Sequence, residues 1–221
     1  YKLLLFKSLL DEVQNSTQNE ATEFKNLALK SLSYAYYTIS FYKLSFGKSD
    51  RMTRWTESLS FININTNQDY SASNIYDQLL DNQNTIEVQN FISEFSELVP
   101  YRLLSPFFEN ELRGLKDHKK NRLIQEKSLE KNSVSLYKIE GTGRDIKLTL
   151  NSSWYLYMNE NYSILRGWLN SSLVSYLQLR NPTVLSVCTK LEPPLNRNMN
   201  LIKKEFEDFF HCHNDLQRCL Y

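Results

Sequence analysis

Residues 168–210 read WLNSSLVSYLQLRNPTVLSVCTKLEPPLNRNMNLIKKEFEDFF and carry the most regular helical spacing in the chain. Apolar side chains recur there at three- and four-residue steps: Trp168, Leu169, Leu173, Val174, Tyr176 and Leu177. This spacing predicts an amphipathic helix from Tyr162 to about Arg180, because the residue before Pro182 disfavours the helical backbone. After a polar loop, a second apolar stripe predicts another helix over residues 200–213, made of Leu201, Phe206, Phe209 and Phe210.

Helical patterns continue upstream of this segment. Residues 2–14 and 21–43 are predicted helices, and the second carries bulky apolar groups on most of its faces, which is typical of the buried centre of a bundle. Shorter helices are expected around Trp55 and over residues 74–80 and 86–98. Pro100 should end the last of these, since proline lacks the amide hydrogen that a helix interior needs, and residues 101–108 should form an irregular connection.

A single β element interrupts these helices. Residues 134–140 and 145–150 alternate between apolar and polar side chains, and Gly141-Thr142-Gly143-Arg144 supplies a turn between them. A short helix carrying Trp154, Tyr155 and Tyr157 should follow. The fold class is therefore predicted to be mainly α, a multi-helix bundle with one β-hairpin (about residues 134–150) packed on it.

Composition limits the possible partners and compartments. The chain has 221 residues and a formal net charge of +1, so any nucleic-acid contact must come from local clusters of charge. Three cysteines (Cys188, Cys212 and Cys219) are too few for a disulfide framework. The apolar opening YKLLLFKSLL is too short to span a bilayer and lacks a signal-peptide cleavage pattern. We expect a cytoplasmic, soluble protein with no membrane partner.

Two short motifs suggest sites but fit them poorly. Gly47-Lys48-Ser49 resembles the end of a phosphate-binding loop, yet Tyr42 stands where that motif requires glycine, and a helix C-cap at Gly47 is favoured instead. His211-Cys212-His213 and Cys219 are zinc-ligand types, but six residues separate the two cysteines, which matches no common zinc site. We assign no catalytic residue and no metal ligand in this chain.

Residues 109–133 hold seven lysines and arginines against five acids. Such a segment could contact phosphates, but interspersed acids repel a phosphate backbone, so a solvated face of mixed charge is favoured.

The segment LVSYLQLRNPTVLSVCTKLEPPLNR (173–197) resembles a bacterial HNH endonuclease family, in the region ahead of its nuclease core. FYKLSFGKSDRM (41–52) and VPYRLLSPFF (99–108) resemble two further segments of that family, in the same order. The resemblance implies that residues 1–210 form the helical region N-terminal to the nuclease core. Residues 211–221 would then begin a truncated ββα-metal core, making this chain a fragment. The divalent metal and the catalytic residues would belong to that core, with no cofactor in this chain, and a role in defence is suggested.

The cations within these segments are the candidates for DNA contact: Lys48, Arg102, Arg180, Lys190 and Arg197. Arginine suits bidentate contacts to phosphate or guanine, but each of these cations could instead pair with an acid or, like Arg180, stabilise a helix end. Two functions stay open. The chain either positions DNA or regulates an HNH nuclease, or it is a non-catalytic helical module that binds a protein partner. A continuous basic groove would favour the first, and a large exposed apolar patch the second.

Overall fold

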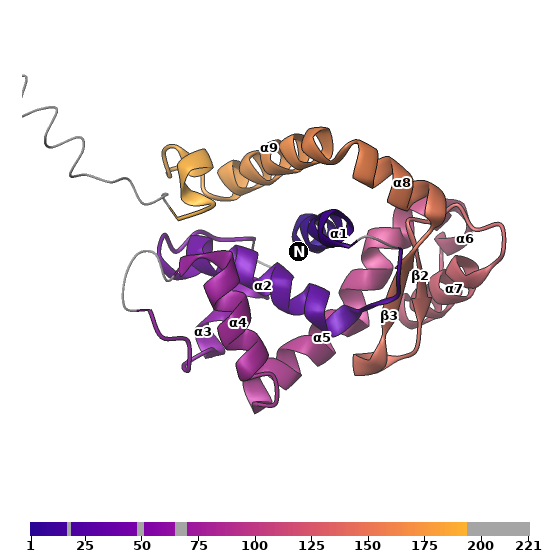
Figure 1. The fold of residues 1–221 in the computed structure, drawn as a ribbon, viewed down its shortest axis with the longest axis horizontal. Coiled ribbons are helices and arrows are strands. Elements are labelled where there is room, and N and C mark those ends of the chain that lie inside the picture. Colours follow the sequence, from indigo (N-terminus) through magenta and orange to yellow (C-terminus); the bar gives the residue numbers. More distant parts are fainter. Residues whose placement is uncertain (17–18, 48–50, 65–69, 194–221) are drawn as a thin grey trace, which may run out of the picture.

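The computed structural model describes residues 1–16, 19–47, 51–64 and 70–193 (Figure 1). The fold is mainly helical with a small antiparallel sheet, which confirms the predicted fold class. The helices are α1 (Lys2–Asn15), α2 (Phe24–Ser40), α3 (Met52–Ser58), α4 (Ala72–Asp81), α5 (Ile86–Leu104), α6 (Glu109–Leu112), α7 (Asp117–Leu129), α8 (Ser152–Glu160) and α9 (Tyr162–Arg180). Short 3-10 helices are η2 (Ser105–Phe108), η3 (Gly143–Asp145) and η4 (Val187–Lys190).

Helix α2 lies at the centre of the bundle, as its sequence predicts. Most of its residues are buried, and it contacts α1, α3, α4 and α5. Helix α1 contacts both α2 and α9, and Figure 1 shows α9 running across the top of the molecule above it. The buried stripe of α9 is narrower than predicted and consists of Leu169, Leu173 and Leu177. Trp168 is 55% exposed, and its ring lies nearly perpendicular to the ring of Phe6, with the ring centroids 6.2 Å apart.

The predicted hairpin forms, and it gains a third strand. Strands β2 (Tyr137–Glu140) and β3 (Lys147–Leu150) pair antiparallel, and β1 (Thr22–Glu23) pairs with the other edge of β3. The expectation that a helix begins at residue 21 and continues to 43 is therefore wrong. Thr22 and Glu23 join the sheet instead, so α2 starts at Phe24, and it ends at Ser40.

Pro100 does not end α5, contrary to the sequence prediction. The helix continues to Leu104, and residues 105–108 form η2 instead of an irregular connection. Proline inside a helix costs about 3 kcal/mol. The surroundings offset this cost, because Val99, Tyr101 and Leu104 are buried in the core. In addition, the fully buried Tyr137 hydroxyl donates a 2.6 Å hydrogen bond to the carbonyl of Pro100.

An aspartate on α1 joins three helices. The Asp11 carboxylate, with 14% of its side chain exposed, accepts hydrogen bonds from the hydroxyls of Tyr34 on α2 (2.6 Å) and Tyr162 on α9 (3.0 Å). Arg166 of α9 adds a 2.8 Å ion pair to the same carboxylate. These three contacts of Asp11 hold α1 between α2 and α9.

Within the part of the chain that the structure describes, no helix is long and apolar enough to cross a membrane.

Replacing Tyr137 by phenylalanine tests the support of the proline-containing helix. Tyr137→Phe should lower the free energy of unfolding by about 1 kcal/mol, because it removes one buried hydrogen bond with little change in volume. Urea denaturation followed by circular dichroism measures the change. Tyr157→Phe, at a side chain that is 49% exposed, is the matched control. An equal loss in both variants would contradict the assigned role of the Tyr137 hydroxyl.

Replacing Asp11 by asparagine tests the joint between the three helices. Asp11→Asn should cost about 2 kcal/mol of unfolding free energy, since the charge opposite Arg166 is lost and one acceptor oxygen becomes a donor. Asp81→Asn, at an exposed carboxylate ending α4, should change stability by less than about 0.5 kcal/mol. A loss in Asp11→Asn no greater than in this control would contradict the proposed joint.

Candidate nucleic-acid interface

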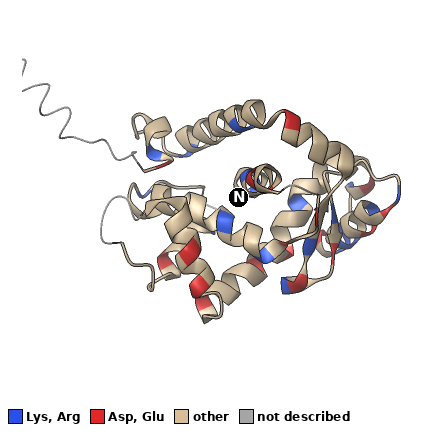
Figure 2. Ribbon diagram, viewed as in Figure 1, with Lys and Arg blue, Asp and Glu red and all other residues tan. Residues whose placement is uncertain are grey.

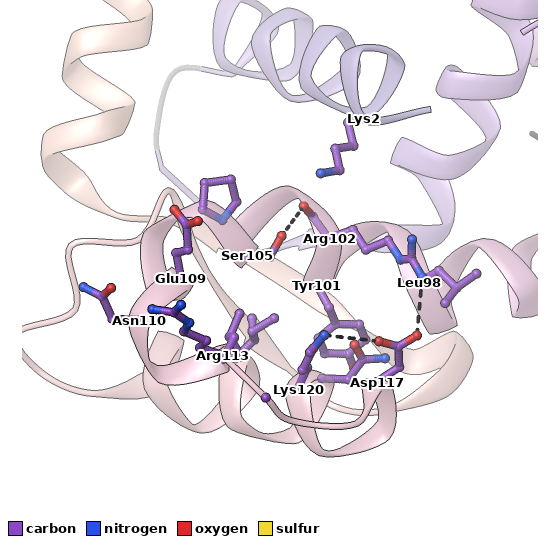
Figure 3. A pocket seen from close by; sticks show the side chains of 15 residues that line it. Lys2, Leu98, Tyr101, Arg102, Ser105, Glu109, Asn110, Arg113, Asp117 and Lys120 are labelled. Carbon is purple, nitrogen blue, oxygen red and sulfur yellow. Dashed lines mark hydrogen bonds and ion pairs between the residues drawn. The ribbon is translucent and has the colours of Figure 1, made fainter. Parts of the chain in front are cut away.

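Two cavities lie side by side at the start of α1. The first, the α5–α7 cleft, has a volume of about 900 Å³ and carries the cations Lys2, Arg102, Arg113 and Lys120 (Figure 3). The second, the α9 pocket, has a volume of about 750 Å³ and lies between the first residues of α1, the loop at residues 45–47 and the end of α9. Lys2 lines both cavities, which places them next to each other.

The α5–α7 cleft has an excess of positive charge. Its acids are Glu109 and Asp117, against four cations. Asp117 lies 3.8 Å from Arg102 and 3.5 Å from Lys120, and its side chain is 75% exposed, so these ion pairs are weak and open to exchange with another anion. Among the described residues, neither Lys2 nor Arg113 has an ion-pair partner, so both cations are available to a ligand.

Two further cations of the charged segment at residues 109–133 pair with acids of the same segment. Arg122 lies 2.8 Å from Glu126, and Lys127 lies 2.8 Å from Glu130. These pairs produce the mixed-charge face that the interspersed acids predict. From this segment, only Arg113 and Lys120 contribute cations to the cleft.

The side chain of Asn181 holds Ser45, which lines the α9 pocket, against the end of α9. Its amide oxygen accepts a 2.8 Å hydrogen bond from the backbone N–H of Ser45, and its amide nitrogen donates to the carbonyls of Ser45 (2.9 Å) and Leu177 (2.8 Å). Tyr176 also donates a hydrogen bond to the carbonyl of Phe46. Residues 45–46 and 176–181, which belong to two of the segments on which the predicted HNH kinship rests, therefore meet at these hydrogen bonds.

Gly47 occupies this loop for a steric reason and not as a helix cap. Helix α2 ends at Ser40 and its C-cap is Phe41, so the predicted C-cap at Gly47 is wrong. Gly47 has a φ of +114°, which side chains rarely adopt, and a Cβ there would lie 3.3 Å from the Tyr176 hydroxyl. The close approach of this loop to α9 thus depends on glycine.

Arg180 lies at the rim of the α9 pocket. Its guanidinium lies over the ring of Tyr176, 5.5 Å from the ring centre, and it pairs with no acid among the described residues. Arg180 also ends α9, where a positive charge favours the helix dipole. The planar cation is consequently held on an aromatic ring with its outer side exposed.

The structure separates the five cations proposed from the sequence. Arg102 lines the cleft and Arg180 lines the pocket. Lys190 lines neither; its ammonium donates to the carbonyls of Leu185 and Ser186 and lies over the ring of Tyr42. Two of the five, Lys48 and Arg197, lie outside the described residues, as do the zinc-ligand types at 211–213 and 219.

Sequence reasoning missed two residues that shape this candidate interface, Lys2 and Asn181. It considered phosphate contact for the segment that holds Arg113 and Lys120 but favoured a solvated face. Asn181 lies directly after α9 and before a proline. This position was the one local signal in the sequence that could have pointed to Asn181. The described residues contain no group of three or more His, Cys, Asp or Glu side chains that could hold a metal ion.

Removing the Asn181 side chain should loosen the loop at residues 45–47. Asn181→Ala should lower the unfolding free energy by about 2 kcal/mol, because three hydrogen bonds of a nearly buried amide are lost. It should also speed hydrogen exchange at the Ser45 amide about tenfold, which NMR can measure residue by residue. Asn161→Ala is the control, since Asn161 makes one exposed hydrogen bond at the start of α9. Unchanged exchange at Ser45 would contradict this assignment.

Comparison of the chain with protein families, with characterised proteins and with solved structures found no match. Kinship with HNH endonucleases therefore stays a prediction from the sequence motifs, and function must be argued from the geometry of the two cavities.

Proposed function

We propose that this chain binds DNA and positions it for an HNH-type nuclease core. The proposal rests on the position of Lys2, which lines both the α5–α7 cleft and the α9 pocket. Lys2 thereby connects the cations of the two cavities into one surface, the cationic track. The track consists of Lys2, Arg102, Arg113, Lys120 and Arg180.

The charge of the track suits a phosphate backbone. The whole chain has a net charge of only +1, whereas the track gathers five cations against the two acids of the cleft. Each phosphate that a lysine or arginine neutralises releases condensed counterions from DNA, which favours binding at low salt. The weak ion pairs of Asp117 with Arg102 and Lys120 would give way to phosphates as partners of these two cations.

Cleavage is not assigned to the described residues. They hold no cluster of metal ligands, and the sequence resemblance places the divalent metal and the catalytic residues after residue 210. In this proposal the helical region supplies affinity and orientation. A duplex held along the track would present its backbone to a core that follows in the chain.

A second function, that of a helical module for protein contacts, is favoured by apolar side chains exposed outside the two cavities. On α8 and α9 these are Leu156, Tyr157, Ile164 and Trp168. These two helices also carry few charges (Figure 2). Apolar side chains gathered on one face often mark a protein interface. Binding to a protein partner would replace DNA binding as the proposed function if the chain failed to bind DNA at low salt.

Neutralising two cations of the cleft should weaken DNA binding. For the double variant Arg102→Gln/Arg113→Gln, the dissociation constant for a short duplex should rise about tenfold at low salt. The slope of log affinity against log salt should fall by about 2, because two phosphate contacts are lost. Fluorescence anisotropy across a salt series measures both quantities.

The matched control is Arg122→Gln/Lys131→Gln, which removes two exposed cations outside the cleft. It should leave the affinity within about twofold of the unchanged chain, since the overall charge loss is the same but the track is intact. Equal losses in the two double variants would show that the net charge, and not the track, sets the affinity.

A further inference from the structure

The α9 pocket differs in chemistry from the cleft beside it. Apolar and aromatic side chains form most of its lining: Tyr1, Leu3, Phe46, Leu173, Tyr176 and Leu179. Its cations are Lys2 and Arg180, and no acid lines it. A phosphate alone gains nothing from apolar walls, whereas a flat, weakly polar group attached to a phosphate would gain from both parts of the pocket.

The pocket is also formed before any ligand arrives. Phe46 and Leu173 are buried in its walls, and the hydrogen bonds of Asn181 and Tyr176 fix the loop at residues 45–47 against α9. A volume of about 750 Å³ lies within the range of cavities that bind small organic groups. Binding would therefore require little reorganisation of the backbone.

The rim provides a platform for stacking. The guanidinium of Arg180 lies on the ring of Tyr176, and Leu179 beside it is 74% exposed. Unpaired bases stack on aromatic rings and on the planar guanidinium of arginine, and this recognition needs no particular base sequence. A base entering here would place its own phosphate near Lys2, at the boundary with the cleft.

We propose that the α9 pocket receives an unpaired nucleobase, so that the DNA bound by this chain is a junction between duplex and single strand. The inference rests on the proposed DNA-binding function and names its substrate. The duplex part lies along the cleft cations, and the first unpaired nucleotide turns into the α9 pocket. The pocket then selects ends, gaps or bubbles over continuous duplex.

The test compares three DNAs bound by the 221-residue chain: a blunt duplex, the same duplex with a short single-stranded overhang, and that overhang with abasic sites. The two overhangs carry the same number of phosphates and differ only in their bases. The intact overhang should bind about tenfold tighter than the abasic one, since base stacking supplies the difference. With 2-aminopurine at the junction, fluorescence should change on binding.

Two variants locate the effect. Arg180→Lys keeps the positive charge but removes the planar guanidinium, so the preference for the intact overhang should fall to about twofold or less. Leu179→Ser should reduce the preference in the same direction. Leu185→Ser, at another exposed leucine that does not line the pocket, should keep the full preference.

The outcomes separate this inference from the proposed function. Salt-dependent binding to all three DNAs, with equal affinity for intact and abasic overhangs, would overturn the nucleobase pocket and leave the cationic track standing. A preference that survives in Arg180→Lys and Leu179→Ser would also overturn it. Absence of binding to any DNA at low salt would overturn both proposals.

Discussion

The arrangement of this domain depends on one carboxylate, that of Asp11. It accepts hydrogen bonds from Tyr34 and Tyr162 and pairs with Arg166, so α1 cannot shift without breaking contacts to α2 and α9. Burial raises the pKa of Tyr34, and its hydrogen bond to Asp11 raises that pKa further, so the hydroxyl stays a donor at physiological pH. Because α1 is held in this way, Lys2 at its first turn lies where the two cavities meet.

The second fixed point is the contact between the loop at residues 45–47 and the end of α9. Asn181 pairs with both backbone groups of Ser45 in the manner of a neighbouring strand, and Gly47 permits the close approach. These residues lie within two of the segments from which kinship with HNH endonucleases is predicted. Their contact gives both segments a structural role that requires no catalytic residue.

The sequence predicts those elements of the fold that depend on residues close together in the chain. The apolar periodicity of α1, α2 and α9 and the glycine-containing turn before β3 were sufficient, because these features depend on neighbouring residues. Strand β1 and the passage of α5 through Pro100 depend on distant partners, β3 and Tyr137, so no local pattern reveals them. The candidate interface follows the same rule. Arg102 and Arg180 lie in segments that the sequence analysis singled out, whereas Lys2 lines the cleft because of the packing of α1.

Protection of lysines by bound DNA would test the cationic track most directly. The chain would be acetylated with and without a short duplex, and the modified lysines identified by mass spectrometry. DNA along the track predicts that Lys2 and Lys120 are protected, while the exposed Lys131 and Lys147 react as in the free chain. Protection of Lys131 and Lys147 with full reaction at Lys2 and Lys120 would contradict it, and so would no protection under conditions where DNA binds.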